Sequence, residues 1–281
     1  MSTELATYYE RLGRWNRVGQ AMGYGGGSAS LTVHRALADP RANGHATFTR
    51  LHDVIAEHLP PMRQPRVLDA GCGLGGTMLA LADALDATCT GLTLSSFQAA
   101  EANAAAARRG LNRQVNAVVQ SYDAPPDGPF DLVVAIESLA HSSNPARSVA
   151  RLAGVLSPGG HLVIVDDMPA DADQSSSDLT TFKAGWQCPV LWSLEEYLRA
   201  LPLTGLELVR EVDLTDSVRL RSHLQIDLLM ALNRAARLIP LAALRQVMDS
   251  HLGGLALERL TRKQLVRYRL LVARSPELRV S

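Results

Sequence analysis

The stretch VLDAGCGLGGT, residues 67–77, decides the fold of this chain. An apolar run leads straight into a glycine-rich turn, in which Gly71, Gly73 and Gly76 have the spacing G-x-G-x-x-G. Glycines let the backbone turn sharply and approach a bound nucleotide, because no side chain stands in the way. The spacing is typical of dinucleotide-binding turns, but the glycines alone do not identify the nucleotide. The residues before and after the turn must do so.

Short apolar runs alternate with helical patterns from residue 66 onward. Five strands are predicted at residues 66–70, 88–94, 115–119, 132–136 and 161–166. Helices are predicted between them at residues 77–85, 96–109 and 145–156, and the SPGG segment at 157–160 is predicted to form a turn. Two further strands are predicted at residues 206–212 and 266–273. This alternation predicts an α/β fold with a doubly wound, mostly parallel seven-stranded sheet.

Two helical segments flank this pattern. Residues 1–62 are expected to form an N-terminal helical arm, and its last helix ends at Pro60–Pro61. Residues 63–281 form the main domain, with a helical insertion at about 217–260 between the last two strands. Apolar residues recur there at helical spacing, namely Leu224, Leu228, Leu229 and Leu232.

Composition limits the function classes. The 281 residues include 28 basic and 28 acidic side chains, so no nucleic-acid partner is expected. Three cysteines at unrelated spacings indicate a reducing compartment and no zinc site. The N-terminus lacks an apolar signal core, and polar residues interrupt the most apolar later stretch, so no membrane span is expected. These features predict a soluble cytoplasmic protein and leave open a homo-oligomer.

The residues around the glycine turn argue against a nicotinamide cofactor. Asp69 stands two residues before Gly71, and the second strand ends in TGLTLSS, without the acid that grips a ribose in nicotinamide folds. S-adenosylmethionine carries a sulfonium and an ammonium group and no phosphate. A carboxylate beside the turn can bind that ammonium group, whereas it would contribute nothing to the binding of a pyrophosphate. Asp69, Gly71 and Gly73 are therefore expected to bind S-adenosylmethionine.

The motifs resemble a known family. LDAGCGLGG looks like motif I of the class I S-adenosylmethionine-dependent methyltransferases, and the resemblance covers roughly residues 66–273. GLTLSSFQ, residues 91–98, is similar to the G-x-T-L-S-x-x-Q of the branch that includes cyclopropane fatty acid synthases and sterol and tocopherol C-methyltransferases. In that branch the threonine, the following backbone and the glutamine bind the ribose. The resemblance thus implies ribose contacts from Thr93, Leu94 and Gln98.

The same resemblance adds further cofactor positions. Relatives often have an aspartate where Ser121 stands, which accepts a hydrogen bond from the adenine amino group, and a serine can also accept one. The expected cofactor site also includes Tyr122, which follows Ser121, and Ile136, which ends the strand predicted at residues 132–136. The glycine-rich segment that begins at Tyr24 resembles the arm segment that touches the cofactor in this branch.

Glu137 and His141 are the catalytic candidates. The segment AIESLAHS, residues 135–142, resembles the I-E-x-x-x-H of sterol methyltransferases, and Ala140 stands where cyclopropane synthases have a glutamate. Methyl transfer depends mostly on positioning, and a base is needed where the acceptor loses a proton. If a helical turn follows the strand, the four-residue spacing puts both side chains on one face. The alternative is a helix cap and a satisfied polar residue.

The acidic run after the fifth strand has two interpretations. Asp166, Asp167, Asp171 and Asp173 could bind a divalent metal, but a solvated loop is favoured and no metal is expected.

The leading function is methyl transfer from S-adenosylmethionine to a lipophilic small molecule, a terpenoid or prenylated specialised metabolite, with carbon slightly favoured. Two aromatic windows, one in the arm and one at residues 182–197, are expected to line the acceptor pocket. The alternatives are an O- or N-methyltransferase of a polar natural product and a methyltransferase of an isoprenoid diphosphate, for which Arg219, Arg221 and His223 could supply charge. A cofactor-binding subunit without activity and a nicotinamide oxidoreductase also stay open.

Overall fold

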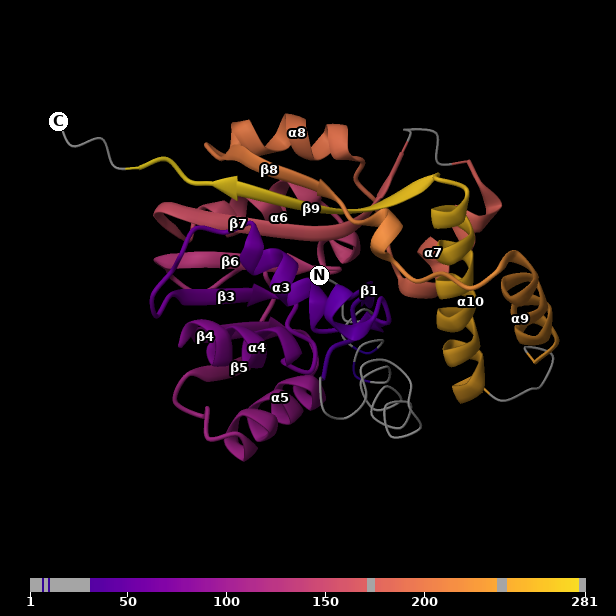
Figure 1. Ribbon diagram of the computed structural model, residues 1–281, viewed down its shortest axis with the longest axis horizontal. Helices are drawn as coiled ribbons and strands as arrows, with labels where there is room; N and C mark the ends of the chain where they lie inside the picture. The colour runs from indigo at the N-terminus through magenta and orange to yellow at the C-terminus, as the bar shows by residue number, and fades with distance from the viewer. Residues whose placement is uncertain (1–6, 8–9, 11–30, 171–174, 237–241, 278–281) are drawn as a thin grey trace.

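Seven strands form one sheet in the order β5-β4-β3-β6-β7-β9-β8 (Figure 1). The computed structural model describes residues 7, 10, 31–170, 175–236 and 242–277. The strands are β3 (Arg66–Ala70), β4 (Thr88–Thr93), β5 (Val115–Val119), β6 (Phe130–Ile136), β7 (Leu156–Pro169), β8 (Glu207–Asp213) and β9 (Val266–Arg274). The first five pair in parallel, and β9 is antiparallel to both β7 and β8. The predicted mostly parallel, seven-stranded sheet is confirmed.

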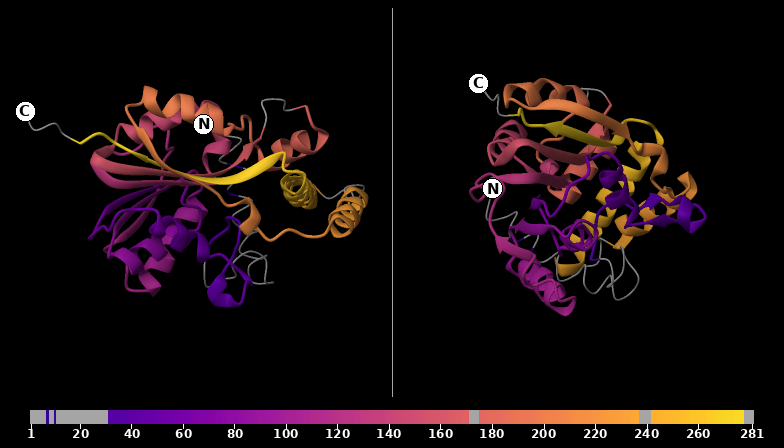
Figure 2. Two further views of the ribbon diagram at one scale, coloured as in Figure 1. Left: turned by 45° about the horizontal axis from the view of Figure 1, so that its top comes forward. Right: turned by 60° about the vertical axis from the view of Figure 1, so that its left-hand side comes forward.

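Helices cover both faces of the sheet (Figure 2). They are α3 (Arg50–Glu57), α4 (Gly76–Leu85), α5 (Ser96–Arg108), α6 (Pro145–Ala153) and α8 (Leu194–Leu203). Residues of α3, α4 and α5 share one apolar core with the sheet, and residues of α6 and α8 share a second core with it. Most residues of the central strands β3 and β6 are apolar and buried on both faces, as expected for parallel strands between two layers of helices.

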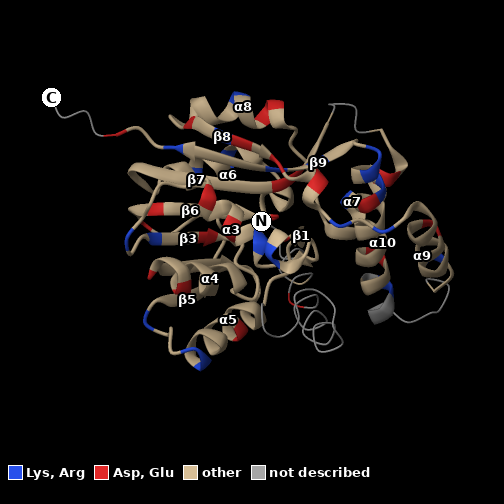
Figure 3. Ribbon diagram, viewed as in Figure 1, with Lys and Arg blue, Asp and Glu red and all other residues tan. Residues whose placement is uncertain are grey.

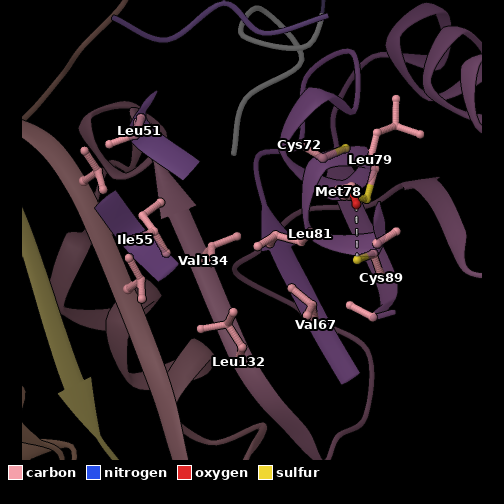
Figure 4. Close-up of a cluster of buried hydrophobic side chains, with 14 of the residues drawn as sticks. Leu51, Ile55, Val67, Cys72, Met78, Leu79, Leu81, Cys89, Leu132 and Val134 are labelled. Atoms are coloured by element: carbon pink, nitrogen blue, oxygen red, sulfur yellow. Dashed lines mark hydrogen bonds between the residues drawn. The ribbon is translucent and has the colours of Figure 1, made fainter. Parts of the chain in front are cut away.

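The core beside α3 and α4 supports the glycine turn. Figure 4 shows Leu51 and Ile55 of α3 on one side of this core and the start of α4 on the other. The Cys89 thiol donates to the carbonyl oxygen of Met78 at 3.5 Å, which ties β4 to α4. The turn between β3 and α4 is thus anchored at both ends by buried residues.

The SPGG segment, residues 157–160, is not the predicted turn. It lies inside β7, and the pairing of β7 with β6 jumps from Phe130–Leu156 to Leu132–His161 across it. The N–H of Gly159 donates to the carbonyl of Pro276 at 3.1 Å, so the segment after β9 holds it in the sheet. The segment is therefore a bulge, and α6 ends at Ala153 rather than at residue 156.

Three helices gather beyond the carboxyl ends of the parallel strands (Figure 1). They are α7 (Ser177–Trp186), α9 (His223–Ala236) and α10 (Ala242–Arg262), which we call the cap. Their apolar side chains form a core of their own. Opposite charges meet where α7 contacts α10 (Figure 3): Arg259 Nη1 and Lys263 Nζ lie 3.1 and 3.3 Å from the Asp178 carboxylate. The predicted insertion is indeed helical.

The buried face of α9 differs from the leucine stripe in the sequence. Leu224, Leu228 and Leu232 are 79%, 58% and 56% exposed, whereas Ile226 and Met230 are buried in the core of the cap. The helical spacing of the leucines is real, but tertiary packing selects the adjacent face.

The described part of the predicted arm packs on the main domain. After residue 31 it forms the two-stranded sheet of β1 (Leu37–Ala38) and β2 (Ala46–Thr47), the short helix η1 (Pro40–Ala42) and α3. Leu37 is fully buried in the same core as α3 and α4. Among the described helices, none has the combination of length and apolar character that crossing a membrane requires.

Candidate active site

The glycine turn after β3 contains three left-handed residues. Gly71, Gly73 and Gly75 have φ angles of 111°, 51° and 86°, whereas Gly76 is the first residue of α4. A Cβ atom on Gly75 would lie 2.8 Å from Ala102 Cβ, so this glycine permits close packing against α5. A Cβ atom on Gly73 would lie 3.8 Å from its nearest neighbour, which is a side-chain atom. The described residues leave room at Gly73, as a cofactor cradle requires.

Asp69 provides a buried carboxylate directly before the turn. It is 3% exposed, and its Oδ2 has no hydrogen-bond partner in the described part of the chain. Burial raises the pKa of Asp69 to about 7. An unpaired buried acceptor is costly, and a bound cation would offset the cost. The ammonium group of S-adenosylmethionine therefore fits this position.

Thr93 and Gln98 meet at the start of α5, as the ribose assignment requires. The Thr93 hydroxyl donates to Gln98 Oε1 at 2.6 Å, and both side chains are buried. That bond uses the amide oxygen of Gln98. Its amide nitrogen makes no hydrogen bond within the described residues, so a donor remains for a ribose hydroxyl. Leu94 is half-buried between them.

Glu10 reaches the same place from the N-terminal segment. Its carboxylate accepts from the Ser95 hydroxyl at 2.6 Å and from the N–H of Phe97 at 3.3 Å. A negative charge at the N-terminus of α5 is favourable because the helix dipole is positive there. The sequence analysis missed this contact, since no motif links residue 10 to residue 95.

The remaining cofactor candidates follow β5 and β6 at the same edge of the sheet. Ser121 is half-buried, and its hydroxyl oxygen accepts from the N–H of Asp123 at 3.1 Å. The buried Tyr122 hydroxyl donates to the carbonyl oxygen of Ser138 at 3.0 Å, which ties the two loops together. Ile136 is the half-buried last residue of β6. The remaining candidate, Tyr24, lies outside the described residues.

Glu137 lies just past β6 in a left-handed conformation with φ of 49°. Its Oε1 accepts two hydrogen bonds of 2.8 Å, from the backbone N–H of Arg35 and from the Tyr268 hydroxyl. Burial raises the pKa of Glu137, and the two donors act in the opposite direction. The sequence analysis assigned no role to Arg35 or Tyr268, which lie far from Glu137 in the chain.

His141 contacts other groups than Glu137 does. It ends the short helix η2 (Leu139–His141), and its Nδ1 lies 3.4 Å from the carbonyl oxygen of Gln187 and 3.9 Å from the Cys188 sulfur. Burial lowers the pKa of His141 to about 4, so the imidazole is neutral at pH 7. The single 3₁₀ turn and the left-handed Glu137 replace the α-helical turn that would have aligned Glu137 with His141.

The expectation of a solvated acidic loop is wrong for Asp166 and Asp167. Both are 4% exposed within β7, because this strand continues to Pro169 opposite β9. Asp166 accepts from the N–H of Ala140 at 3.1 Å, and Asp167 lies 3.2 Å from Arg35 Nη2. Asp171 and Asp173 lie outside the described residues. Within the described ranges, no group of three or more His, Cys, Asp or Glu side chains is arranged to hold a metal ion.

The aromatic window at residues 182–197 is partly structural. Phe182 and Tyr197 are each 2% exposed and belong to the core of the cap and the core beneath α8, respectively. Trp186 and Trp192 are half-buried and pack edge-on against these two rings. Only the tryptophans therefore keep surface that an acceptor could contact. The aromatic window of the arm, Tyr8, Tyr9, Trp15 and Tyr24, lies outside the described residues.

Comparisons with known proteins agree with this geometry. The profile of the family described as "Methyltransferase domain" matches residues 68–164. The "O-methyltransferase rstn1" of Aspergillus nomiae is 31% identical, and the match covers 62% of this chain and 78% of that protein. The "Probable tocopherol O-methyltransferase, chloroplastic" of Oryza sativa subsp. japonica is 32% identical over 75% of this chain, which spans 61% of that relative's length.

A solved structure extends the agreement to the whole fold. The structure of "Geranyl diphosphate methyltransferase in complex with GPP and sinefungin" matches with a TM-score of 0.75 at 21% identity, over 96% of this chain and 97% of that chain. The match includes the cap and β9, which lie outside the family profile. The glycine turn, the unpaired Asp69 oxygen and the family shared with the Aspergillus relative together assign the cofactor as S-adenosylmethionine. The chain therefore belongs to the class I S-adenosylmethionine-dependent methyltransferase family.

Proposed function

We propose that this protein is an enzyme that transfers the methyl group of S-adenosylmethionine to a lipophilic small molecule, a terpenoid or a prenylated metabolite. The observation that carries the proposal is the position of Glu137. This residue follows β6 at the edge of the sheet where Asp69 and the glycine turn follow β3, and β3 and β6 are neighbours. A proton acceptor and a cofactor site therefore share one crevice.

Each residue has a defined task in this proposal. S-adenosylmethionine supplies an electrophilic methyl group when bound. Asp69 binds the ammonium group, Gly73 leaves room for the adenosyl moiety, and Thr93 and Gln98 bind the ribose. Glu137 takes the proton that the acceptor loses, and the neutral His141 orients the acceptor through a hydrogen bond. Positioning of the acceptor against the methyl group supplies most of the rate.

The cap supports a lipophilic acceptor. It lies beyond the carboxyl ends of the parallel strands (Figure 1), and the half-buried Trp186 of its α7 packs beside Gly253 of α10. The core of the cap is apolar, and the carboxylate of Asp178 is already paired with Arg259 and Lys263. An apolar cap beside the cofactor site suits a ligand with an extended hydrocarbon portion.

The isoprenoid diphosphate alternative receives less support. Arg221, one of the three residues considered for a diphosphate, pairs with Glu258 through both its guanidinium and its backbone N–H. A diphosphate would have to displace that carboxylate. Methylation at oxygen is the second candidate, because both curated relatives described above are named as O-methyltransferases. The resemblance of residues 135–142 to sterol methyltransferases favours carbon.

The test begins with cofactor binding and ends with the acceptor. Calorimetry should show micromolar-range binding of S-adenosylmethionine and of its demethylated product, and titration with NADH should show none. Methyl-labelled S-adenosylmethionine is then incubated with prenylated compounds paired with their unprenylated cores. We expect faster methylation of the prenylated member of each pair, with the methylated atom identified by NMR. Equal or faster methylation of the polar cores would overturn the lipophilic acceptor but leave the methyltransferase assignment in place.

The state of the thiols supports the proposal of a cytoplasmic location. Cys72, Cys89 and Cys188 are all buried and unpaired, which suits a reducing cytoplasm.

A further inference from the structure

Three neighbouring strands present Glu137, Asp167 and Tyr268 side by side. The backbone N–H of Glu137 donates to the carbonyl oxygen of Val165 in β7 at 2.7 Å, and Asp167 pairs directly with Tyr268 across β7 and β9. Arg35 lies over this row, with its Cζ 5.5 Å from the centre of the Tyr268 ring and its Nη2 3.2 Å from Asp167. The strands thus position one carboxylate, one guanidinium and one phenol around Glu137.

The two hydrogen bonds to Glu137 end on the same oxygen. Both the Arg35 N–H and the Tyr268 hydroxyl donate to Oε1, and no hydrogen bond to Oε2 is formed within the described part of the chain. Glu137 nevertheless keeps partial exposure, whereas Tyr268 is fully buried. Within the described residues, therefore, the protein fixes one carboxylate oxygen of Glu137 and gives the other no hydrogen-bond partner.

We propose that Tyr268 and the backbone N–H of Arg35 are positioning groups, which hold Glu137 by one oxygen so that Oε2 accepts the proton released by the methyl acceptor. The inference rests on the proposed function, because it assumes that Glu137 is the base. In the step, the bond between the methyl carbon and sulfur breaks and the bond between the methyl carbon and the acceptor atom forms. The acceptor's proton moves to Oε2, while Oε1 keeps both hydrogen bonds.

The charges around Glu137 explain why positioning matters. Burial opposes ionisation of Glu137, while the Arg35 guanidinium and the two donors to Oε1 favour it. The charge of Glu137 in turn raises the pKa of Asp166 and of Asp167. A hydrogen bond to a charged group contributes roughly 1.5–3 kcal/mol. Loss of the Tyr268 hydroxyl should therefore raise the pKa of Glu137 further, because one donor that favours the carboxylate is removed.

The experiment compares Tyr268→Phe with Ser157→Ala. Tyr268→Phe keeps the ring beneath Arg35 and deletes one donor to Glu137. The Ser157 hydroxyl donates to Asp131 at 3.0 Å at the opposite edge of the sheet, so Ser157→Ala also deletes a hydroxyl-to-carboxylate bond but leaves the site intact. The kcat is measured from pH 5 to 9 with both substrates saturating, and melting temperatures confirm folding. The acidic limb of the profile of kcat against pH should move to higher pH, by roughly one to two pH units, in Tyr268→Phe and not in Ser157→Ala.

The other outcomes separate the two proposals. If Glu137→Gln abolishes turnover while Tyr268→Phe lowers kcat equally at every pH, Glu137 is the base and Tyr268 is merely structural, which overturns the positioning role. If Glu137→Gln retains turnover, the proposed base itself is wrong. Should Tyr268→Phe not fold, Arg35→Gln replaces it. This variant removes a positive charge that favours the carboxylate, so its acidic limb must also move up, and an unmoved limb overturns the inference.

Discussion

A Cβ atom on Gly71 would lie 2.6 Å from the Cβ of Ser138, a distance that two such carbons do not tolerate. The turn after β3 therefore touches the loop after β6, and only glycine permits this contact. From β3 the chain continues to β4 and β5 on one side of the sheet, and then to β6 and β7 on the other. Ligands of open α/β sheets bind at such a switch point. The Gly71–Ser138 contact thus joins the two loops at the switch point, where the cofactor is expected.

The first prediction separates cofactor binding from folding at the glycine turn. Gly73→Ala and Gly73→Val should fold, because the nearest atom to an added Cβ is 3.8 Å away. Both should lose binding of S-adenosylmethionine, because the added carbons occupy the space of the adenosyl moiety. Gly71→Ala should instead destabilise the protein by several kcal/mol, as overpacked core positions do. Calorimetry and thermal unfolding measure the two effects.

Gly205→Ala is the matched control for backbone strain. Gly205 also has a left-handed φ, of 79°, and an added Cβ would have no atom within 4 Å. Gly205→Ala should lower the free energy of unfolding by about 1 kcal/mol, as Gly73→Ala does, but its affinity for the cofactor should be unchanged. Normal cofactor binding by Gly73→Val would show that the turn does not hold the cofactor.

The second prediction concerns the pH dependence of stability at Asp69. Burial raises the pKa of Asp69 in the folded protein to about 7, from 3.8. Between these values the folded protein binds more protons than the unfolded chain, so the Asp69 contribution to stability falls as pH rises from 4 to 7 and is constant above. Asp69→Asn should therefore match the wild type near pH 4 and exceed it at pH 8, by up to roughly 4 kcal/mol.

Cofactor affinity should change in the opposite direction. Asp69→Asn loses the charge that binds the ammonium group, so affinity for S-adenosylmethionine should fall by at least about tenfold. A variant that is more stable without ligand and weaker in binding has no ordinary structural explanation. Identical stability curves from pH 4 to 8, or unchanged affinity, would contradict the assignment of Asp69.

Local signals predicted the cofactor side of the protein well. The bounds of β3 and β5 agree with the sequence, because a glycine turn or short polar segments delimit these strands. Thr93 and Gln98 meet as expected, since they are only five residues apart at a strand-to-helix junction. Here neighbours in sequence are neighbours in space.

The acceptor side depends on contacts that no local pattern carries. β7 outlasts its predicted end because β9, about a hundred residues later, pairs with it through Pro169. That pairing buries Asp167, and it also brings Tyr268 to Glu137, 131 positions away. Arg35 joins them from the N-terminal segment. Sequence motifs therefore offered Glu137 as a candidate, but not the groups that hold it.

The third prediction concerns the two catalytic candidates. Glu137→Gln and His141→Ala should each slow turnover by roughly a hundredfold or more, the usual effect of losing an acid–base group. Affinity for S-adenosylmethionine should change much less, because neither side chain lies on the glycine turn. Since the pKa of His141 is lowered to about 4, His141 should add no pH dependence between pH 5 and 8. Single-turnover kinetics with labelled cofactor provide the measurement, and near-normal rates in both variants would make these residues structural.

The last prediction uses two adjacent glycines of α10 to test whether the cap binds the acceptor. A Cβ atom on Gly253 would lie 2.6 Å from Trp186 Cδ1 and 3.2 Å from Gly185 Cα, so Gly253→Ala must push α7 and α10 apart. At Gly254 the nearest atom is 3.7 Å away, which is ordinary contact. Gly254→Ala should therefore stabilise the helix by up to about 1 kcal/mol, the propensity difference between the two residues. Gly253→Ala should destabilise the protein by about 1–3 kcal/mol.

Kinetics of the same pair then locate the acceptor. If the half-buried Trp186 forms part of the acceptor wall, its displacement in Gly253→Ala should raise the KM for the acceptor at least severalfold. The affinity for S-adenosylmethionine should stay unchanged, because the glycine turn and Asp69 lie on β3 and α4. Gly254→Ala should keep both values, which controls for a second alanine in the same turn of the helix. If Gly253→Ala is destabilised but keeps the KM for the acceptor, the cap does not form part of the acceptor site, because Trp186 would have moved without affecting the ligand.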